Sequence, residues 1–365
     1  MSATTMVATF RVTTPMFCGG ADGRSAELRP ASFKGVLRFW WRACAWSHFK
    51  GELRKIREEE AKLFGSPDTG QSRVWLRMDQ PTVPSKRSHD VLGSDGVRYL
   101  GFGLNPFDGS TRECLAEPFD LTVTLRCRGV APADTELLGR AVTALGTVGG
   151  MGARSRRGFG SLSLTRLHVA GEDQPVPTSP ADLDAVISGF HGGDPTRLPE
   201  YTAFSGQSRH LVLQCDTAHA REVLDQLGME FADYRRRKRG GWRSQKLAGD
   251  HTIATRGTSS GAHPKRIAFG LPLNVFGEKK PVEPVEHTRR ASPLLFHIHQ
   301  FGGKAVAVVS FLPAQFLPKG KSAVTLPKGD RRHVDGGAAV YQPVVDFLDH
   351  LEQERPFTPV RQVRR

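Results

Sequence analysis

The chain has 365 residues, of which 38% are hydrophobic, enough to form two domains of ordinary size. Lysine and arginine number 51 against 37 aspartate and glutamate residues, and the formal net charge of +14 suggests a polyanionic partner. The five cysteines are scattered without a Cys-x-x-Cys pair, which disfavours a disulfide framework or a zinc ribbon. The sequence shows no signal-like N-terminus and no long apolar run, so we expect a cytoplasmic protein without a membrane span.

Strand and helix patterns alternate along the first 170 residues. Ser32 is the predicted N-cap of a helix over 33–49, and Trp40, Trp41 and Trp46 of this apolar helix are expected in the core. The remaining segments of this half predict strands at 6–17, 73–78, 116–129 and 161–169 and a helix at 134–148. This order predicts an α+β fold that resembles a split βαβ, ferredoxin-like unit.

The composition shifts to Pro, Gly, Asp and Ser at residues 171–200, which we interpret as a linker between an N-terminal domain, 1–170, and a C-terminal domain, 201–365. The second domain is expected to hold a basic, partly helical insertion at about 216–265. Its periodic segments predict strands at 208–216, 293–300 and 304–312 and helices at 218–241 and 339–354. The order suggests that the second half repeats the first architecture.

A glycine-rich loop, GGMGARSRRGFGS at residues 149–161, holds five glycines and three arginines. The loop lacks the Gly-Lys-Ser/Thr ending of a nucleotide-binding P-loop, and its glycines do not form G-x-G-x-x-G between a strand and a helix. Nucleoside triphosphates and dinucleotides are therefore not expected as ligands or cofactors. Because the loop follows a helix, whose negative dipole end repels anions, Arg154, Arg156 and Arg157 would have to supply the attraction, while glycine lets an extended ligand approach the backbone. We expect the three arginines to be exposed and dispensable for stability. The alternatives are a solvated turn, or an arginine that is buried and paired.

Basic residues also follow one stripe of the first predicted helix. Lys34, Arg38 and Arg42 are spaced by four residues and therefore share a face. Lys34 would lie in the first turn after Ser32, where the helix dipole disfavours a cation by roughly 0.3–1 kcal/mol unless an anion docks there. The alternative is a solvated face on which the arginine stems cover apolar neighbours.

A third basic cluster ends the long helix of the second half, next to Tyr234 and Trp242, on which a base could stack. Its cations are Arg235, Arg236, Arg237, Lys238, Arg239, Arg243 and Lys246. A run this dense repels itself unless it is solvated or neutralised, so a disordered basic loop and a nucleic-acid contact both fit.

Catalytic and metal-binding signatures are lacking in the sequence. His297 and His299 share a face of a predicted strand without a third ligand nearby, which favours a structural role. Asp22 is an isolated loop acid. We therefore expect no metal site and no cofactor.

Four segments carry a family resemblance: 14–43, 99–104, 152–162 and 289–300. Together they resemble the first subunit of the Cmr effector complexes of type III-B CRISPR systems, which belongs to the RAMP superfamily. The resemblance implies an α+β fold of two tandem ferredoxin-like (RRM-like) domains, with the glycine-rich loop near the first helix. It touches both halves of the chain and covers 171–265 poorly.

The resemblance implies an RNA-binding subunit without enzymatic activity, which caps the end of the effector that holds the 3′ part of the guide RNA and the paired target RNA. Its partners would be these RNAs, the other Cmr RAMP subunits and the small helical subunit. No association with a membrane is expected. The candidate RNA-binding residues are Arg29, Lys34, Arg38, Arg42, Gly149, Gly150, Gly152, Arg154, Arg156, Arg157, Gly158, Gly160, Arg235, Arg236, Arg237, Lys238, Arg239, Arg243, Arg289 and Arg290.

The competing hypothesis is a metal-independent endoribonuclease of the same superfamily that processes guide RNA. In it a histidine such as His48 would be the general base, and lysine or arginine would stabilise the phosphorane. His48 lies beyond the basic stripe, toward the far end of the predicted helix, which weighs against this hypothesis.

Overall fold

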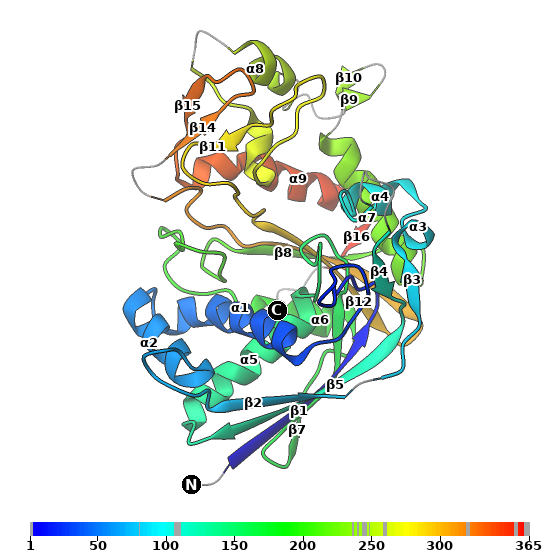
Figure 1. Cartoon of the computed structure of the whole chain (residues 1–365), viewed down its shortest axis with the longest axis vertical. Helices are drawn as coiled ribbons and strands as arrows, with labels where there is room; N and C mark the ends of the chain where they lie inside the picture. The colour runs from blue at the N-terminus through cyan, green and yellow to red at the C-terminus, as the bar shows by residue number, and fades with distance from the viewer. Residues whose placement is uncertain are drawn as a thin grey trace.

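Two antiparallel sheets organise the chain in a computed structural model, which describes residues 3–79, 81–105, 111–235, 237–238, 241–242, 247, 249–257, 261–318, 322–353 and 357–360 (Figure 1). The helices are α1 Pro30–His48, α2 Leu53–Phe64, α3 Ser88–Val91, α4 Asp95–Leu100, α5 Pro132–Val148, α6 Pro180–Ser188, α7 Ala220–Arg235, α8 Asp250–Arg256 and α9 Gln342–Gln353, with 3-10 turns η2 Lys265–Phe269 and η3 Ala338–Tyr341. The strands are β1 Ala3–Val12, β2 Val74–Met78, β3 Ser85–Arg87, β4 Glu113–Leu115, β5 Phe119–Arg128, β6 Leu162–Val169, β7 Glu172–Gln174, β8 Arg209–Gln214, β9 Arg237–Lys238, β10 Gly241–Trp242, β11 Glu283–Pro284, β12 Leu294–Phe301, β13 Lys304–Phe311, β14 Ala323–Thr325, β15 Arg331–His333 and β16 Thr358–Pro359.

The first sheet has the strand order β2-β5-β1-β6-β7, and α1 and α5 pack together on one of its faces (Figure 1). Alternate side chains of β1 are buried, Met6, Ala8, Phe10 and Val12, because successive residues of a strand point to opposite faces. Without the edge strand β7, the chain order β1-α1-β2-β5-α5-β6 gives the spatial order of a ferredoxin-like fold.

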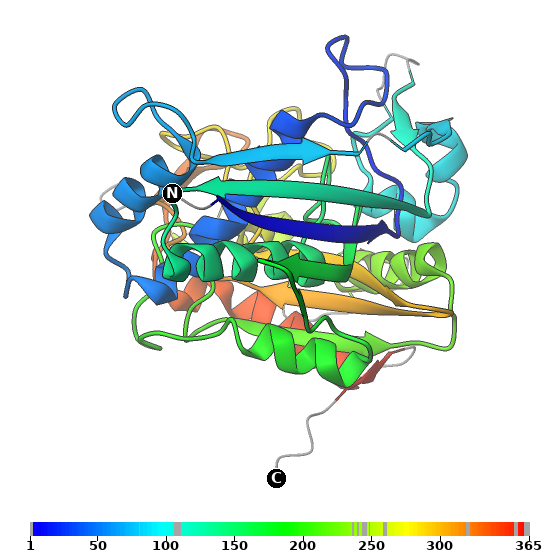
Figure 2. The same ribbon diagram turned by 90° about the horizontal axis from the view of Figure 1, so that it is seen from below.

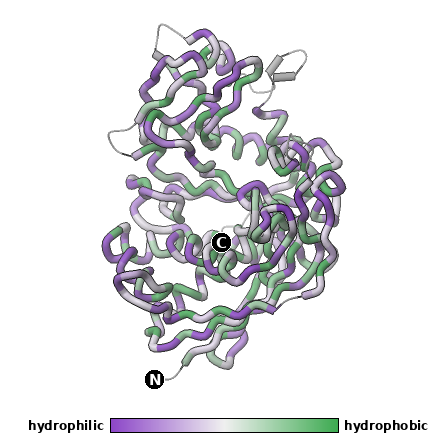
Figure 3. Tube along the Cα trace, in the orientation of Figure 1, coloured by the Kyte–Doolittle hydropathy of each residue, from purple (hydrophilic) through white to green (hydrophobic). Residues whose placement is uncertain are grey.

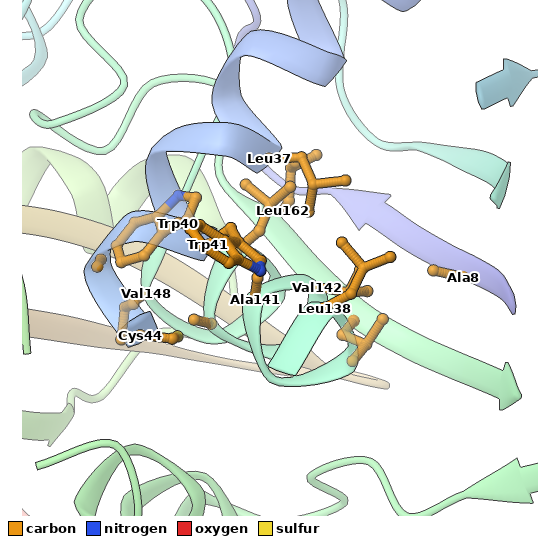
Figure 4. Close-up of a cluster of buried hydrophobic side chains, with 14 of the residues drawn as sticks. Ala8, Leu37, Trp40, Trp41, Cys44, Leu138, Ala141, Val142, Val148 and Leu162 are labelled. Atoms are coloured by element: carbon orange, nitrogen blue, oxygen red, sulfur yellow. The ribbon is translucent and has the colours of Figure 1, made fainter. Parts of the chain in front are cut away.

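The three tryptophans of α1 are buried as expected, at 2%, 1% and 4% exposure for Trp40, Trp41 and Trp46. Figure 4 shows Trp40 and Trp41 above Leu138, Ala141 and Val142 of α5. Hydrophobic residues gather along the sheets and the helices packed on them (Figure 3). This apolar contact fixes α1 against α5 and so holds the loop that follows α5 next to α1.

The second sheet repeats the same plan in the order β12-β13-β8-β16. Its chain order, β8-α7-β12-β13-α9-β16, is again ferredoxin-like, which confirms the tandem α+β fold expected from the sequence. The strands predicted at 208–216, 293–300 and 304–312 correspond to β8, β12 and β13. Within the described ranges no helix is long and apolar enough to cross a membrane.

The two halves meet where β12 runs beside the glycine-rich loop and β6 (Figure 2). Three amides of β12 bond to the first half: that of Phe296 donates to the Arg156 carbonyl at 3.1 Å. Those of Ile298 and Gln300 donate to the serine hydroxyls of Ser161 and Ser163, each at 3.0 Å. The glycine-rich loop is therefore part of the joint between the two domains.

The structure corrects two predicted boundaries. Helix α1 begins at Pro30 with Arg29 as its N-cap, because proline fits the first helical turn, so Ser32 is not the cap. Lys34 is consequently the fifth residue of α1 and not a first-turn cation. The helix expected over 218–241 ends at Arg235, and β9 and β10 form a short hairpin beyond it.

Several segments for which no helix or strand was predicted hold regular structure. Residues 53–64 form α2, and residues 85–100 hold β3, α3 and α4. The segment 171–200, expected to be a linker, holds β7, which pairs with β6, and α6, which packs on β8. Helix α8 lies within the insertion expected at about 216–265.

Candidate nucleic-acid interface

The glycines of the loop make room for the protein's own backbone. A Cβ on Gly149 would stand 2.6 Å from the Leu145 carbonyl oxygen, and one on Gly150 would stand 2.9 Å from the Gly160 carbonyl oxygen. Gly152, Gly158 and Gly160 have φ angles of +98°, +83° and +60°, which favour glycine. Close packing and left-handed backbone thus already require these glycines, so access for a ligand is not needed to explain them.

Arg157 points into the protein, contrary to the expectation that the loop arginines are exposed. Its guanidinium donates to the Phe269 carbonyl at 3.4 Å and lies 4.7 Å from the Phe231 ring centre. Its Nη1 is buried without a hydrogen-bond partner among the described residues. Burial, with Arg235 nearby, lowers the pKa of Arg157 to about 9. Arg157 thus holds the second domain to the loop, in agreement with the alternative of a buried arginine.

Arg156 is also turned inward and joins three parts of the chain. Its guanidinium donates to the Ser292 carbonyl at 2.7 Å, reaches the Thr202 hydroxyl at 3.4 Å and lies 5.1 Å from the Phe39 ring centre of α1. Burial, and then the charge of Arg290, lowers its pKa to about 10. Arg156 therefore bridges the loop, α1 and the second domain.

Arg154 is the loop arginine that faces solvent. Its backbone has a φ of +61°, which is uncommon outside glycine, and its guanidinium donates to the Phe102 carbonyl. Burial, and then the charge of Arg289, lowers its pKa, so these two arginines lie near each other. Arg289 itself is exposed. The pair forms a positively charged edge beside the loop.

The basic stripe of α1 is partly neutralised by α2. The Arg38 Nε and the Arg42 Nη1 donate to the same Glu60 carboxylate oxygen, at 2.9 and 2.8 Å. The Glu60 side chain is only 9% exposed, against 37% and 39% for the two arginines, so the carboxylate lies beneath them. Lys34 is half-buried without an acidic partner in the described chain, and Arg29 is exposed at the helix start.

The remaining candidates are two half-buried arginines, a two-residue strand, and residues outside the described ranges. Arg235 donates to the Tyr99 hydroxyl at 3.0 Å and lies against the Phe231 ring. Arg290 donates to the Tyr341 hydroxyl at 2.8 Å. Arg237 and Lys238 form β9, and Arg236, Arg239, Arg243 and Lys246 lie outside the described residues.

A pocket of about 280 Å³ opens between the first half of α1 and the glycine-rich loop. Its lining residues are Ser32, Gly35, Val36, Phe39 and Trp40 of α1, Val148, Gly149, Gly150, Ser155 and Arg156 of the loop region, and Leu295 of β12. Neither Gly35 nor Phe39 was selected from the sequence. A glycine within a helix is a signal that could have identified this site, because it costs about 1 kcal/mol relative to alanine.

The two histidines of β12 are structural, as the sequence suggested. His297 is fully buried; its Nδ1 lies 2.7 Å from the Gly149 carbonyl oxygen and its Nε2 lies 3.2 Å from the Nδ1 of His299. Because a carbonyl only accepts, His297 carries its proton on Nδ1 and accepts from His299. Burial lowers the pKa of His297 to about 4. The neutral pair ties the end of α5 to β12.

The residues considered for catalysis do not meet. Asp22 is exposed, and hydrogen bonds from the Arg24 amide and from Ser25 lower its pKa. His48 is the last residue of α1, roughly 21 Å from Lys34 along the axis at 1.5 Å per residue. No cluster of three His, Cys, Asp or Glu residues able to hold a metal ion occurs in the described chain.

Comparisons with known proteins assign the family. The model of the RAMP superfamily matches residues 9–163. The CRISPR system Cmr subunit Cmr1-1 of Pyrococcus furiosus is 26% identical over 81% of this chain and 83% of its own length. Cmr subunit Cmr1-2 of the same organism is 31% identical over 42% of this chain and 91% of its own length.

Solved structures show the same fold. The crystal structure of apo Cmr1 from Pyrococcus furiosus matches with a TM-score of 0.60 at 21% identity, over 97% of this chain and 98% of that one. A chain in a cryo-EM structure of the type III-B Cmr-beta complex bound to cognate target RNA matches with a TM-score of 0.55 at 12% identity, over 95% of this chain and 100% of that one. The protein belongs to the Cmr1 family of CRISPR system Cmr subunits, within the RAMP superfamily.

Proposed function

We propose that this chain is an RNA-binding subunit, without nuclease activity, of a type III-B Cmr effector complex. In this role it caps the end of the complex that holds the 3′ part of the guide RNA and the paired target RNA. Its protein partners are the other Cmr RAMP subunits and the small helical subunit. The names of the two curated relatives, and a similar fold in a complex that contains target RNA, support this role.

The observation that carries the proposal is the set of cations around the glycine-rich loop that reach the surface and have no acidic partner among the described residues. Arg29, Arg154 and Arg289 are exposed, and Lys34 is half-buried. Arg29 lies near Cys18, which contacts the loop at Gly152, so Arg29 and Arg154 flank the same segment. Four such cations suit a ribose-phosphate chain and carry little sequence information, because phosphates are the same at every position.

The absence of catalysis in this proposal rests on geometry. A general base must come within hydrogen-bond reach of the 2′-hydroxyl that it activates. His48 lies at the opposite end of α1 from Lys34, and the Oδ1 of Asp22 accepts hydrogen bonds within its own turn. His48 is therefore remote from Lys34, and Asp22 is held by its own loop.

RNA binding by the purified chain tests the proposal. If four phosphates are neutralised, the slope of log K against log salt should be about −3, at roughly 0.7 per phosphate for a single strand. A 3′-labelled RNA should remain intact with and without magnesium. Affinity independent of salt would contradict backbone binding, and cleavage abolished by His48→Ala would favour the endoribonuclease.

The position in the complex is tested by photo-crosslinking. A guide RNA carrying a photoreactive nucleotide near either its 3′ or its 5′ end is assembled with the full set of Cmr subunits. We expect this chain to be labelled from the 3′ position. Labelling only from the 5′ position would contradict the proposed capping role.

A further inference from the structure

The pocket between α1 and the glycine-rich loop has the wrong lining for a phosphate. Five of its eleven lining residues are apolar and three are glycines. Arg156 is the only charged residue among the eleven, and its guanidinium already donates to Ser292 and reaches Thr202. A phosphate placed here would lose hydration against hydrocarbon without a free cation to compensate, which is unfavourable.

The same lining suits a flat, partly apolar group with polar edges. Phe39 presents an aromatic ring, and the hydroxyls of Ser32 and Ser155 have no partner within the described chain. Gly150 pairs with Ser161 in an antiparallel bridge. The hydrogen bonds of this bridge are donated by the Met151 amide to Gly160 and by the Leu162 amide to the Gly149 carbonyl, so the Gly150 amide takes no part in them. Hydrogen-bond donors therefore border an aromatic wall, which is how proteins hold unpaired nucleobases.

Gly35 shows that the open side of this pocket belongs to α1. A Cβ on Gly35 would meet nothing within 4 Å, whereas a Cβ on Gly149 or Gly150 would meet protein atoms closer than 3 Å. Glycine in the middle of a helix costs about 1 kcal/mol relative to alanine. Packing within the chain does not require this glycine, whereas a ligand lying against the helix backbone would.

We propose that this pocket receives one unpaired nucleobase of the bound RNA, while the sugar-phosphate chain stays outside on Arg29, Lys34 and Arg154. The inference rests on the proposed RNA-binding function and adds a base-binding site to it. Lys34 and Arg154 directly precede the lining residues Gly35 and Ser155 in the sequence, so cations adjoin an apolar interior, as the two ends of a nucleotide require. Stacking accepts any base, so the site need not read sequence.

The test fills the pocket with Gly35→Leu. The variant should melt no lower than the wild type, because leucine favours helix over glycine and its Cβ has open space. Fluorescence anisotropy then measures the affinity of both proteins for a 12-nucleotide RNA and for an abasic RNA with the same backbone. Gly35→Leu should bind the normal RNA at least about 5-fold more weakly, the lower end of base stacking, and should bind the abasic RNA like the wild type.

Two controls accompany the variant. Gly35→Ala keeps the helix and fills less of the pocket, so its loss of affinity should be smaller. Gly139→Ala makes the same helix-favouring change in α5, where the new Cβ would lie 3.6 Å from the Met6 Cε and beside a different groove. It should leave both RNA affinities unchanged.

The outcomes separate this inference from the proposed function. Equal weakening toward normal and abasic RNA would place the backbone in the pocket and overturn base binding. Unchanged affinity in Gly35→Leu would show that RNA does not enter the pocket, and would also overturn it. A wild type that binds neither RNA would overturn the RNA-binding function together with the inference.

Discussion

The glycine-rich loop and helix α1 each carry three cations in a short stretch, yet the fold uses them differently. In the loop, Arg156 and Arg157 turn inward to carbonyl oxygens and aromatic rings. In α1, Arg38 and Arg42 turn to the carboxylate of Glu60. Each element keeps one cation outside these contacts, the exposed Arg154 in the loop and the half-buried Lys34 in the helix. The density of basic residues therefore overstates the charge available to RNA.

The contacts of the loop arginines and those of the α1 arginines contribute differently to stability. The loop arginines are bonded to neutral acceptors at the joint between the domains, so their removal leaves carbonyls and packed rings without a partner. The α1 arginines remain more than a third exposed, where ion pairs typically contribute at most about 1 kcal/mol. Substitutions of Arg156 or Arg157 should consequently affect folding, and those around α1 should affect RNA binding.

The largest effect should come from Arg157→Ala. It removes contacts to Phe269 and Phe231 and leaves a cavity between the domains, which should lower the free energy of unfolding by about 2–4 kcal/mol. Arg154→Ala, at an exposed position, should change it by less than about 0.5 kcal/mol. Urea denaturation of both variants measures the difference, and equal stabilities would contradict the inward role of Arg157.

Arg157→Met separates packing from charge. Methionine fills much of the same volume without a buried charge, so this variant should lose less stability than Arg157→Ala. If both variants lose the same amount, the hydrogen bond to Phe269 matters more than the packing.

Acid should weaken the joint between the loop and β12. The pKa of His297 lies at about 4 in the folded chain, below its ordinary value of 6.5. Between these pH values the unfolded chain binds more protons than the folded chain. The part of the free energy of unfolding that depends on His297 is therefore largest above pH 6.5 and decreases, by up to about 3 kcal/mol, as the pH drops toward 4. Thermal melts from pH 7 to 4 should show a shallower loss for His297→Gln than for the wild type. His48→Gln, at an exposed histidine, should follow the wild type.

Much of the fold could be predicted from the sequence because one face of most long strands is buried. Strand β1 alternates buried and half-buried residues from Met6 onward, and β12 and β13 form nearly continuous buried runs that are mostly apolar. Helix α2 was missed because its sequence, LRKIREEEAKLF, reads as a charged surface in which four buried residues are spread over three turns. The short helix α4 offers only one apolar pair, Val97 and Leu100, and no periodicity.

The site was less predictable because identical arginines have different partners. Arg156 and Arg157 bond to backbone carbonyls of Ser292 and Phe269, which leave no trace in the sequence. Glu60 lies 22 residues from Arg38, on a helix that was not expected. The burial of a guanidinium is decided by such distant contacts, so local composition could locate the basic elements but not their free side chains.

Releasing the α1 arginines should strengthen RNA binding. Glu60→Gln removes the negative charge that neutralises Arg38 and Arg42, so two more cations can reach phosphates. The slope of log K against log salt should become steeper by up to about 1.4, at roughly 0.7 per phosphate. Glu58→Gln, which removes an exposed acid paired with Arg54 on the same helix, should leave the slope unchanged. An unchanged slope in Glu60→Gln would place the RNA path away from these arginines.

The smallest expected effect is a difference in salt dependence between Lys34→Ala and Arg38→Ala, two substitutions on the same stripe of α1. Lys34 has no acidic partner in the described residues, so Lys34→Ala should flatten the salt slope by about 0.7, one phosphate contact. Arg38→Ala should change it little while Glu60 holds that guanidinium, and should flatten it by about 0.7 in the Glu60→Gln background. This double-mutant cycle isolates the coupling between Arg38 and Glu60, since each background changes only one partner. Equal effects of Lys34→Ala and Arg38→Ala in the otherwise native chain would mean that RNA displaces Glu60, and the stripe would then bind as a whole.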